Sequence, residues 1–202
     1  MATVATERAG PGRPSTGARE RILAGCLEVL KSDGYAGLTT AKVAAASGES
    51  KALIAYHFGS KHGLVAAAGH ELGQTITAKI LAGIGDARSA EEIVRGAFDG
   101  AWAILEDDPR LPRVYFDLNA VSVVEPEIRR TIAEVNEQWR DVLVRLLTEA
   151  DDGLTPAKAR VLTVMVIAGM QGMTLERIER GPTPERKRAR ELFIRSAVAT
   201  AG

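Results

Sequence analysis

The chain has 202 residues, which is enough for one large domain or two small ones with a sizeable core. It is 46% hydrophobic and 26% charged with no net charge, a composition typical of soluble globular proteins rather than disordered or fibrous ones. A single cysteine, Cys26, excludes an internal disulfide and a cysteine-based zinc cluster, and its apolar neighbours indicate a buried thiol.

The amino-terminal part of the chain differs from the rest in charge. Residues 1–15 are rich in Gly, Pro and Ala without periodicity, which predicts a disordered tail. Residues 1–63 carry eight Lys or Arg against five Asp or Glu, which hints at an anionic partner for that end. No signal pattern begins the chain, and the apolar run 161–175 is shorter than the roughly 20 residues of a membrane span. We therefore expect a cytoplasmic protein without a membrane contact.

Helical periodicity and helix-end signals continue from residue 16 to the end. A first helix is expected over about residues 16–32, ended by "SDGY" with Gly34 in a left-handed cap. Short helices follow over about 40–46 and from the Ser50 cap to Phe58. A long fourth helix is expected from Ser60 to about Ile84.

The second half of the chain predicts five further helices. Ser89 and Glu92 fit a capping box for a fifth helix that ends before residue 109, and a sixth is expected over about 111–124. Pro126, Pro156 and Pro184 each fit the first turn of a helix. The seventh helix has the one-sided apolar stripe Ile128, Ile132, Val135, Trp139, Val142 and Leu146. The expected fold class is all-α, with about nine helices.

Residues 39–58, "TTAKVAAASGESKALIAYHF", predict a helix-turn-helix. Gly48 can adopt the left-handed conformation that a sharp turn needs. Ile54 and Phe58 lie four residues apart and can both face the core. The opposite side of the second helix then presents Lys51 and small residues, with Leu53 and His57 at its borders, which suits entry into the major groove of DNA.

The stretch 19–64 resembles the amino-terminal DNA-binding domain of the TetR family of bacterial transcriptional regulators. The matching segments are "RERIL" (19–23), "GY" (34–35), "LTTAKVA" (38–44), "SGES" (47–50), "YHF" (56–58) and "SKHGL" (60–64). The variant "HFGSKHGL" is similar to regulators of the betaine-repressor branch. The resemblance implies a tail over 1–15, a DNA-binding domain over 16–62 and a ligand-binding and dimerisation domain over 63–202.

The resemblance also implies residue roles in DNA binding. Thr39, Thr40 and Lys61 would contact phosphates. Tyr56 and His57 would contact the DNA backbone or bases, and the base edges would be faced by Lys51, Ala52, Leu53 and Ala55. Glu49 departs from the family pattern, because a carboxylate near phosphates is repulsive unless it points to Lys51 or into solvent.

Other chemistry fits the same residues less well. His57, His62 and His70 are spaced by five and eight residues without carboxylates arranged beside them, so a metal site is not expected. His57 fits a neutral hydrogen-bond donor to DNA first and a half-buried packing residue second. No catalytic constellation and no cofactor motif is recognisable, so the chain is not expected to be an enzyme. The basic run 186–190 fits the solvated side of the last helix.

The eighth helix is apolar on most of its sides, and a single subunit cannot cover all of this apolar surface. We expect it to pack with the ninth helix against the same pair of a second subunit, as a four-helix bundle. The expected interface residues are Val161, Val164, Ala168, Gly172, Leu175, Leu192, Phe193 and Ser196.

A ligand pocket is expected between the fourth and eighth helices, lined by Phe98, Trp102, Tyr115, Phe116, Asn119, Trp139 and Met165. The same residues could instead be the bulky core of the bundle. The function expected from sequence is a homodimeric regulator, a repressor released from a palindromic double-stranded operator by an apolar or amphipathic small molecule. Two alternatives stay open: an all-helical ligand carrier or enzyme without DNA binding, and a regulator without a natural ligand.

Overall fold

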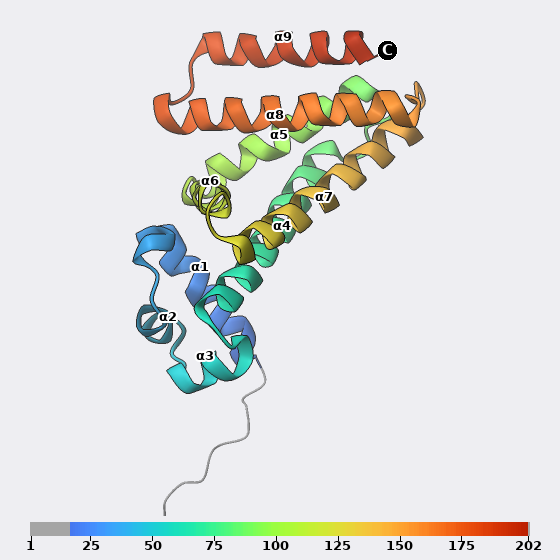
Figure 1. The fold of residues 1–202 in the computed structure, drawn as a ribbon. Coiled ribbons are helices and arrows are strands. Elements are labelled where there is room, and N and C mark those ends of the chain that lie inside the picture. Colours follow the sequence, from blue (N-terminus) through green and yellow to red (C-terminus); the bar gives the residue numbers. More distant parts are fainter. Residues whose placement is uncertain (1–16, 202) are drawn as a thin grey trace, which may run out of the picture.

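The computed structural model describes residues 17–201, and all the regular secondary structure in that range is α-helical. Three helices form a small amino-terminal cluster: α1 (Ala18–Gly37), α2 (Thr40–Ser47) and α3 (Lys51–Phe58). Figure 1 shows this cluster at one end of an elongated molecule. The predicted tail over residues 1–15 lies outside the described residues.

Six further helices follow in the described residues: α4 (Lys61–Ile84), α5 (Ala90–Asp107), α6 (Arg110–Ser122), α7 (Pro126–Glu149), α8 (Pro156–Arg180) and α9 (Pro184–Ala201). In Figure 1, α4 and α7 run diagonally from the small cluster into a carboxy-terminal bundle, and α8 and α9 lie across its far end. The all-α prediction with about nine helices is confirmed for the described residues.

The helix starts follow from the capping residues that the sequence shows. Ser89 accepts a hydrogen bond from the backbone N–H of Glu92, whose side chain returns one to the Ser89 N–H, so the predicted capping box is present. The side chains of Thr155 and Thr183 accept from backbone N–H groups three residues later, and a proline follows each threonine. These local interactions fix where the long helices begin.

Two details of the helices differ from the prediction. Helix α1 breaks at Gly34, but its φ of +68° goes with a ψ of −179°, outside the left-handed helical region that was predicted, and one more helical turn follows it to Gly37. On α7 the buried stripe moves at its carboxy-terminal end, because Leu143 and Leu147 are fully buried whereas Val142 and Leu146 are half-buried. A period of 3.6 residues lets either neighbour continue a stripe, and packing against α8 decides which one does.

The hydrophobic core has two parts. The first joins α1–α3 to the start of α4 and to α6 and α7, through residues such as Ile22, Leu64, Leu118 and Ile128. The second fills the carboxy-terminal bundle around Phe98, Leu143 and Leu162. Helix α4 contributes to both, so it connects the amino-terminal cluster to the bundle.

Helices α4 and α5 cross with their backbones in direct contact. A Cβ added to Gly83 would lie 2.5 Å from the Gly100 nitrogen, and one added to Gly100 would lie 2.6 Å from the Lys79 carbonyl oxygen. Side chains larger than hydrogen would therefore force the two helices apart. This close crossing fixes the position of α4 relative to the bundle.

Among the described helices, α8 alone is long and apolar enough to meet the length and hydropathy of a membrane span. Only 33% of its most apolar 18-residue stretch is buried within the chain. A single helix of this kind is weak evidence for a membrane, because helices in soluble proteins have the same composition.

Candidate DNA-binding surface and ligand cavity

The turn between α2 and α3 has the geometry of a helix-turn-helix. Gly48 ends α2 with φ +71°, a conformation that residues with a side chain rarely adopt. The Thr39 hydroxyl accepts from the Lys42 N–H at 3.2 Å, and the Ser50 hydroxyl accepts from the Leu53 N–H at 3.1 Å. Both short helices therefore start at a fixed residue, which sets the direction of α3.

Helix α3 is anchored on one side and open on the other. Ile54 is buried at 2% exposure in the amino-terminal core, as predicted. Tyr56 is 74% exposed, and Lys51, Ala52 and Ala55 are also exposed. A helix with small side chains, one lysine and one aromatic ring on its solvent side has the shape and hydrogen-bonding groups to enter a major groove.

Leu53 and His57 lie at the borders of this surface, and both are half-buried. The His57 Nε2 atom is buried and has no hydrogen-bond partner among the described residues. Its ring meets the Tyr56 ring edge-on at 5.2 Å between centroids. This placement favours the packing alternative for His57 over a donor to DNA through Nε2.

Lys61 contacts its own chain. Its Nζ lies 4.6 Å from the centroid of the Tyr35 ring and donates to the Tyr35 carbonyl oxygen at 3.4 Å. The predicted phosphate contact would require this long side chain to turn outward. Thr40 is half-buried at the start of α2, beside the exposed Thr39.

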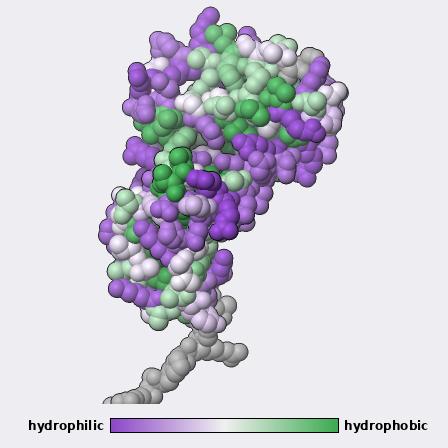
Figure 2. All heavy atoms as spheres, in the orientation of Figure 1, coloured by the Kyte–Doolittle hydropathy of each residue, from purple (hydrophilic) through white to green (hydrophobic). Residues whose placement is uncertain are grey.

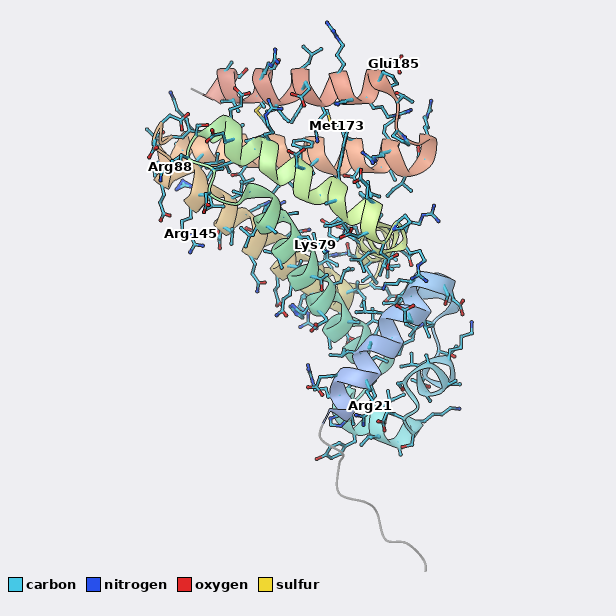
Figure 3. The ribbon with its side chains drawn as sticks, turned by 180° about the vertical axis from the view of Figure 1, so that it is seen from behind. Arg21, Lys79, Arg88, Arg145, Met173 and Glu185 are labelled. Carbon is cyan, nitrogen blue, oxygen red and sulfur yellow. The ribbon has the colours of Figure 1, made fainter. Side chains whose placement is uncertain are left out.

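Glu49 points neither to Lys51 nor into solvent, because it pairs with Arg21 of the same chain. Its Oε1 accepts from the Nε of Arg21 at 2.8 Å and from Nη2 at 2.6 Å. Figure 3 labels Arg21 at the end of α1 that is closest to α3. The pairing crosses 28 positions of sequence and was missed, because nothing in either local sequence indicates it. An arginine and a carboxylate in this geometry neutralise each other beside the recognition helix.

A hydrogen bond joins the amino-terminal cluster to helix α6. The Tyr35 N–H, just after the break at Gly34, donates to the Asp117 carboxylate on α6 at 2.7 Å. Asp117 follows Tyr115 and Phe116, which face the carboxy-terminal cavity described next. One helix therefore touches both regions.

The cavity lies between α4, α5, α6, α7 and α8 and has a volume of about 80 Å³. Three of the seven residues predicted to line a pocket do so: Tyr115, Phe116 and Trp139. The rest of the lining is mainly aliphatic, from residues such as Ile76, Ile80 and Ile167.

The other four predicted lining residues do not reach this cavity. Phe98 is fully buried in the core against the Phe193 ring, with centroids 5.8 Å apart. Trp102 lies between the guanidinium groups of Arg177 and Arg190, at 4.6 and 4.4 Å from its ring. Both residues are on a side of α5 that faces α8 and α9, whereas Ala101 and Ile104 of the same helix face the cavity.

Asn119 and Met165 are the remaining two of these four. The Asn119 side-chain amide donates to the Tyr115 carbonyl oxygen at 2.8 Å, one turn back along α6. Met165 is half-buried against the bundle core. For Met165, as for Phe98, the alternative of a bulky core residue is the better description.

Two polar lining residues that the sequence did not single out, Asn136 and Gln171, form a short hydrogen-bonded chain with the predicted Tyr115 in the cavity wall. The Gln171 amide donates to the Tyr115 hydroxyl oxygen at 2.8 Å, and that hydroxyl is 2.9 Å from the Asn136 side-chain oxygen. Burial raises the pKa of Tyr115, so its hydroxyl stays neutral at physiological pH. The three side chains come from three helices, which sequence spacing alone does not bring together.

The surface expected to meet a second subunit is exposed along α8 and α9. Val161 and Val164 are each 60% exposed and Leu192 is 53% exposed. A Cβ added at Gly172 would meet no atom within 4 Å. Figure 2 shows hydrophobic residues among hydrophilic ones on the visible side of this end of the molecule. The other exposed residues of the expected interface are Ala168, Leu175 and Ser196.

The structure contradicts the solvated reading of the whole basic run 186–190, whereas the place of Phe193 in a dimer interface stays a prediction. The Phe193 ring packs within its own chain, where a Cβ added at Gly169 would lie 2.3 Å from it, so it is half-buried before any partner is present. Arg190 is not solvated, since it is 9% exposed and its Nη1 is 2.6 Å from Asp99. An aliphatic stem and a paired charge allow an arginine to be buried in this way.

No group of three or more potential metal ligands occurs in the part of the chain that the structure describes. His62 lies 3.7 Å from Glu125 and 3.6 Å from Glu127, and His70 lies 3.3 Å from Glu134. These pairs join α4 to α7 along their exposed sides, which makes both histidines surface residues of α4 as expected.

Comparison with known proteins agrees with this geometry. Residues 22–68 match the bacterial regulatory proteins of the tetR family, and residues 86–201 match the carboxy-terminal domain of BetI-type transcriptional repressors. The second match covers more than half of the 202 residues.

Two curated regulators are similar to this chain in sequence, and one solved structure is similar to it in fold. The HTH-type transcriptional regulator BetI 1 of Chromohalobacter salexigens is 26% identical over 125 residues, 60% of each chain, so the match spans less than two thirds of that relative. CymR of Pseudomonas putida is 28% identical over 140 residues, 65% of this chain and 68% of its own. The regulator SCO7518 of Streptomyces coelicolor superposes with a TM-score of 0.73 at 24% identity, covering 92% of this chain and 98% of its own.

Proposed function

The chain belongs to the TetR family of bacterial transcriptional regulators, with a carboxy-terminal domain of the BetI type, and on this premise we propose how it acts. Two copies bind a palindromic DNA operator through α3 and repress transcription from it. A small molecule in the cavity between α4 and α8 releases the DNA. We further propose that the protein is cytoplasmic and is not an enzyme.

The observation that carries this proposal is the exposed side of α3. Lys51 and Tyr56 lie on a helix whose opposite side is held by the buried Ile54, and whose start is fixed by the Ser50 cap. A rigidly held helix can place its exposed side chains against base edges. Because the helix is already fixed in position, no conformational entropy has to be lost to order it when DNA binds. The Arg21–Glu49 pair removes the charge that would oppose the approach of phosphates.

Homodimerisation is proposed from the exposed apolar strip on α8 and α9. Val161, Val164 and Leu192 would be exposed to water in a monomer, which favours a partner surface. A two-fold axis there would place two α3 helices at a fixed spacing, as a palindromic operator requires.

The domain division at residues 62 and 63 is also proposed, with α4 starting just before it.

Selection from random-sequence DNA tests the proposal. The purified protein is mixed with random duplexes at two salt concentrations, and the bound fraction is sequenced. We expect a palindrome whose affinity falls steeply as salt rises. A dimeric sample that enriches no sequence, with and without candidate ligands, would overturn the proposal.

One matched pair of variants locates the contact. Because Lys51 would face base edges in both copies, Lys51→Ala should weaken operator binding by about 1–3 kcal/mol per copy and relax the sequence preference at the base pairs it faces. Lys187→Ala removes an exposed lysine of α9 at the other end of the molecule and should leave affinity and sequence preference unchanged. Equal effects of the two variants would show that α3 is not the DNA-binding element.

A further inference from the structure

The lining of the cavity excludes charged ligands. Among residues 17–201, no Asp, Glu, Lys, Arg or His contributes to its wall, which is formed by aliphatic, aromatic and neutral polar side chains. An ion that entered would lose its hydration and gain no counter-ion, which is strongly unfavourable in an apolar site. A neutral occupant avoids this cost.

The cation whose charge acts on Tyr115 does not change this conclusion. The positive charge of Arg140 acts to lower the pKa of Tyr115, while burial, the larger effect, raises it. Arg140 is itself paired with Glu137, with 2.5 Å between Nη1 and Oε1, and it is not part of the cavity wall. Its charge is therefore already compensated at the surface.

One polar group of the wall lacks a partner. Trp139 lines the cavity at 7% exposure, and its Nε1 is buried without a hydrogen-bond partner among the described residues. An indole N–H can only donate, so an acceptor is missing there. By contrast, Tyr115, Asn136 and Gln171 already bond to one another.

We propose that the cavity binds a small, uncharged, mainly apolar molecule with one carbonyl oxygen, which accepts a hydrogen bond from the Trp139 Nε1–H. This assignment rests on the proposed function, because it names the class of the effector. A carbonyl supplies the acceptor that the indole lacks, and its apolar remainder fits the aliphatic wall.

The size of the cavity limits the molecule. Its volume of about 80 Å³ is smaller than the ~150 Å³ of an apolar cavity that holds benzene. The probes should therefore be smaller than benzene, with about four non-hydrogen atoms. Three molecules of that size and nearly one shape are acetone, 2-methylpropane and acetate, which differ in carrying a carbonyl, no polar atom or a carboxylate.

The chain has only two tryptophans, which makes the test direct. A spectrum of ¹⁵N-labelled protein should contain two indole N–H signals, and Trp102→Phe assigns them. Trp102 is a matched internal control, because its Nε1 is also buried without a partner but the residue does not line the cavity. Each probe is titrated into the DNA-free protein while both signals are followed.

The ketone should move the Trp139 indole proton downfield, as a new hydrogen bond does, and leave that of Trp102 in place. It should bind roughly 5- to 100-fold more tightly than the alkane, the range for satisfying a buried donor. Trp139→Phe should bring the ketone and the alkane to within about twofold of each other. The downfield shift in the unaltered protein suffices as a test if that variant does not fold.

Two outcomes would overturn the inference. Acetate binding as tightly as the ketone would show that charge is accepted, and a Trp139 signal unmoved by all three probes would show that the indole does not recognise a carbonyl. The proposed function is tested separately by operator selection. A recovered operator with no ketone binding refutes only the ligand class, whereas ketone binding with no operator refutes the regulator.

Discussion

Replacement of Asp117 by alanine tests whether α6 connects the cavity to the DNA-binding cluster. Asp117 accepts from the Tyr35 N–H at 2.7 Å, in a half-buried position. A hydrogen bond to a charged group contributes about 1.5–3 kcal/mol to stability, and partial exposure favours the lower end. For a chain of about 200 residues, 1 kcal/mol corresponds to about 2–4 °C in Tm, so Asp117→Ala should lower the Tm by about 3–6 °C.

The assay is thermal unfolding followed by circular dichroism, with two companion variants. Asp117→Asn keeps an oxygen acceptor for the Tyr35 N–H and should recover more than half of the loss. Asp141→Ala removes an exposed carboxylate from α7 and should change the Tm by no more than about 1 °C. If Asp117→Ala matches Asp141→Ala, the contact between α1 and α6 contributes nothing. If Asp117→Asn is as unstable as Asp117→Ala, charge rather than the hydrogen bond is responsible.

Three further predictions concern other parts of the molecule. Gly100→Ala should destabilise the fold by about 1–3 kcal/mol in urea unfolding, because the alanine Cβ would meet the α4 backbone. Alanine is the better helix former, so without this clash the variant would be more stable. A gain in stability would refute the close crossing. Burial raises the pKa of the Cys26 thiol to about 12. Native protein should therefore resist thiol reagents at pH 8, and stability should fall as pH rises above about 9, where the unfolded thiol ionises first. Ala168→Arg should give monomers that no longer bind DNA, and dimers retained in ultracentrifugation would contradict the proposed interface.

The sequence predicted well the features that depend on a few adjacent residues. Helix starts at Ser50, Ser89 and Thr155 follow from a side chain that caps the helix it precedes. The anchored Ile54 and the exposed Tyr56 follow from the helical period within one short segment. Such features need no knowledge of what the rest of the chain does.

The contacts that the sequence did not predict join residues far apart in the chain. Arg21 with Glu49, and Trp102 with Arg177 and Arg190, depend on how helices cross. The same applies to the cavity wall, where a bulky residue on α5 could face either the cavity or α8. Phe98 and Trp102 face away from the cavity because the glycine crossing at Gly83 and Gly100 fixes the rotation of α5 against α4.

This crossing also bears on how the two ends of the molecule can influence each other. Because α4 meets α5 backbone to backbone, the carboxy-terminal part of α4 cannot slide past α5 without a clash. Helix α6 carries the cavity residues Tyr115 and Phe116 next to Asp117, which accepts a hydrogen bond from the Tyr35 N–H. The Tyr35 ring in turn contacts the Nζ of Lys61, the first residue of α4. We therefore expect a molecule that displaces α6 to act on the start of α4 and on the helix-turn-helix through these contacts, while the glycine crossing stays fixed.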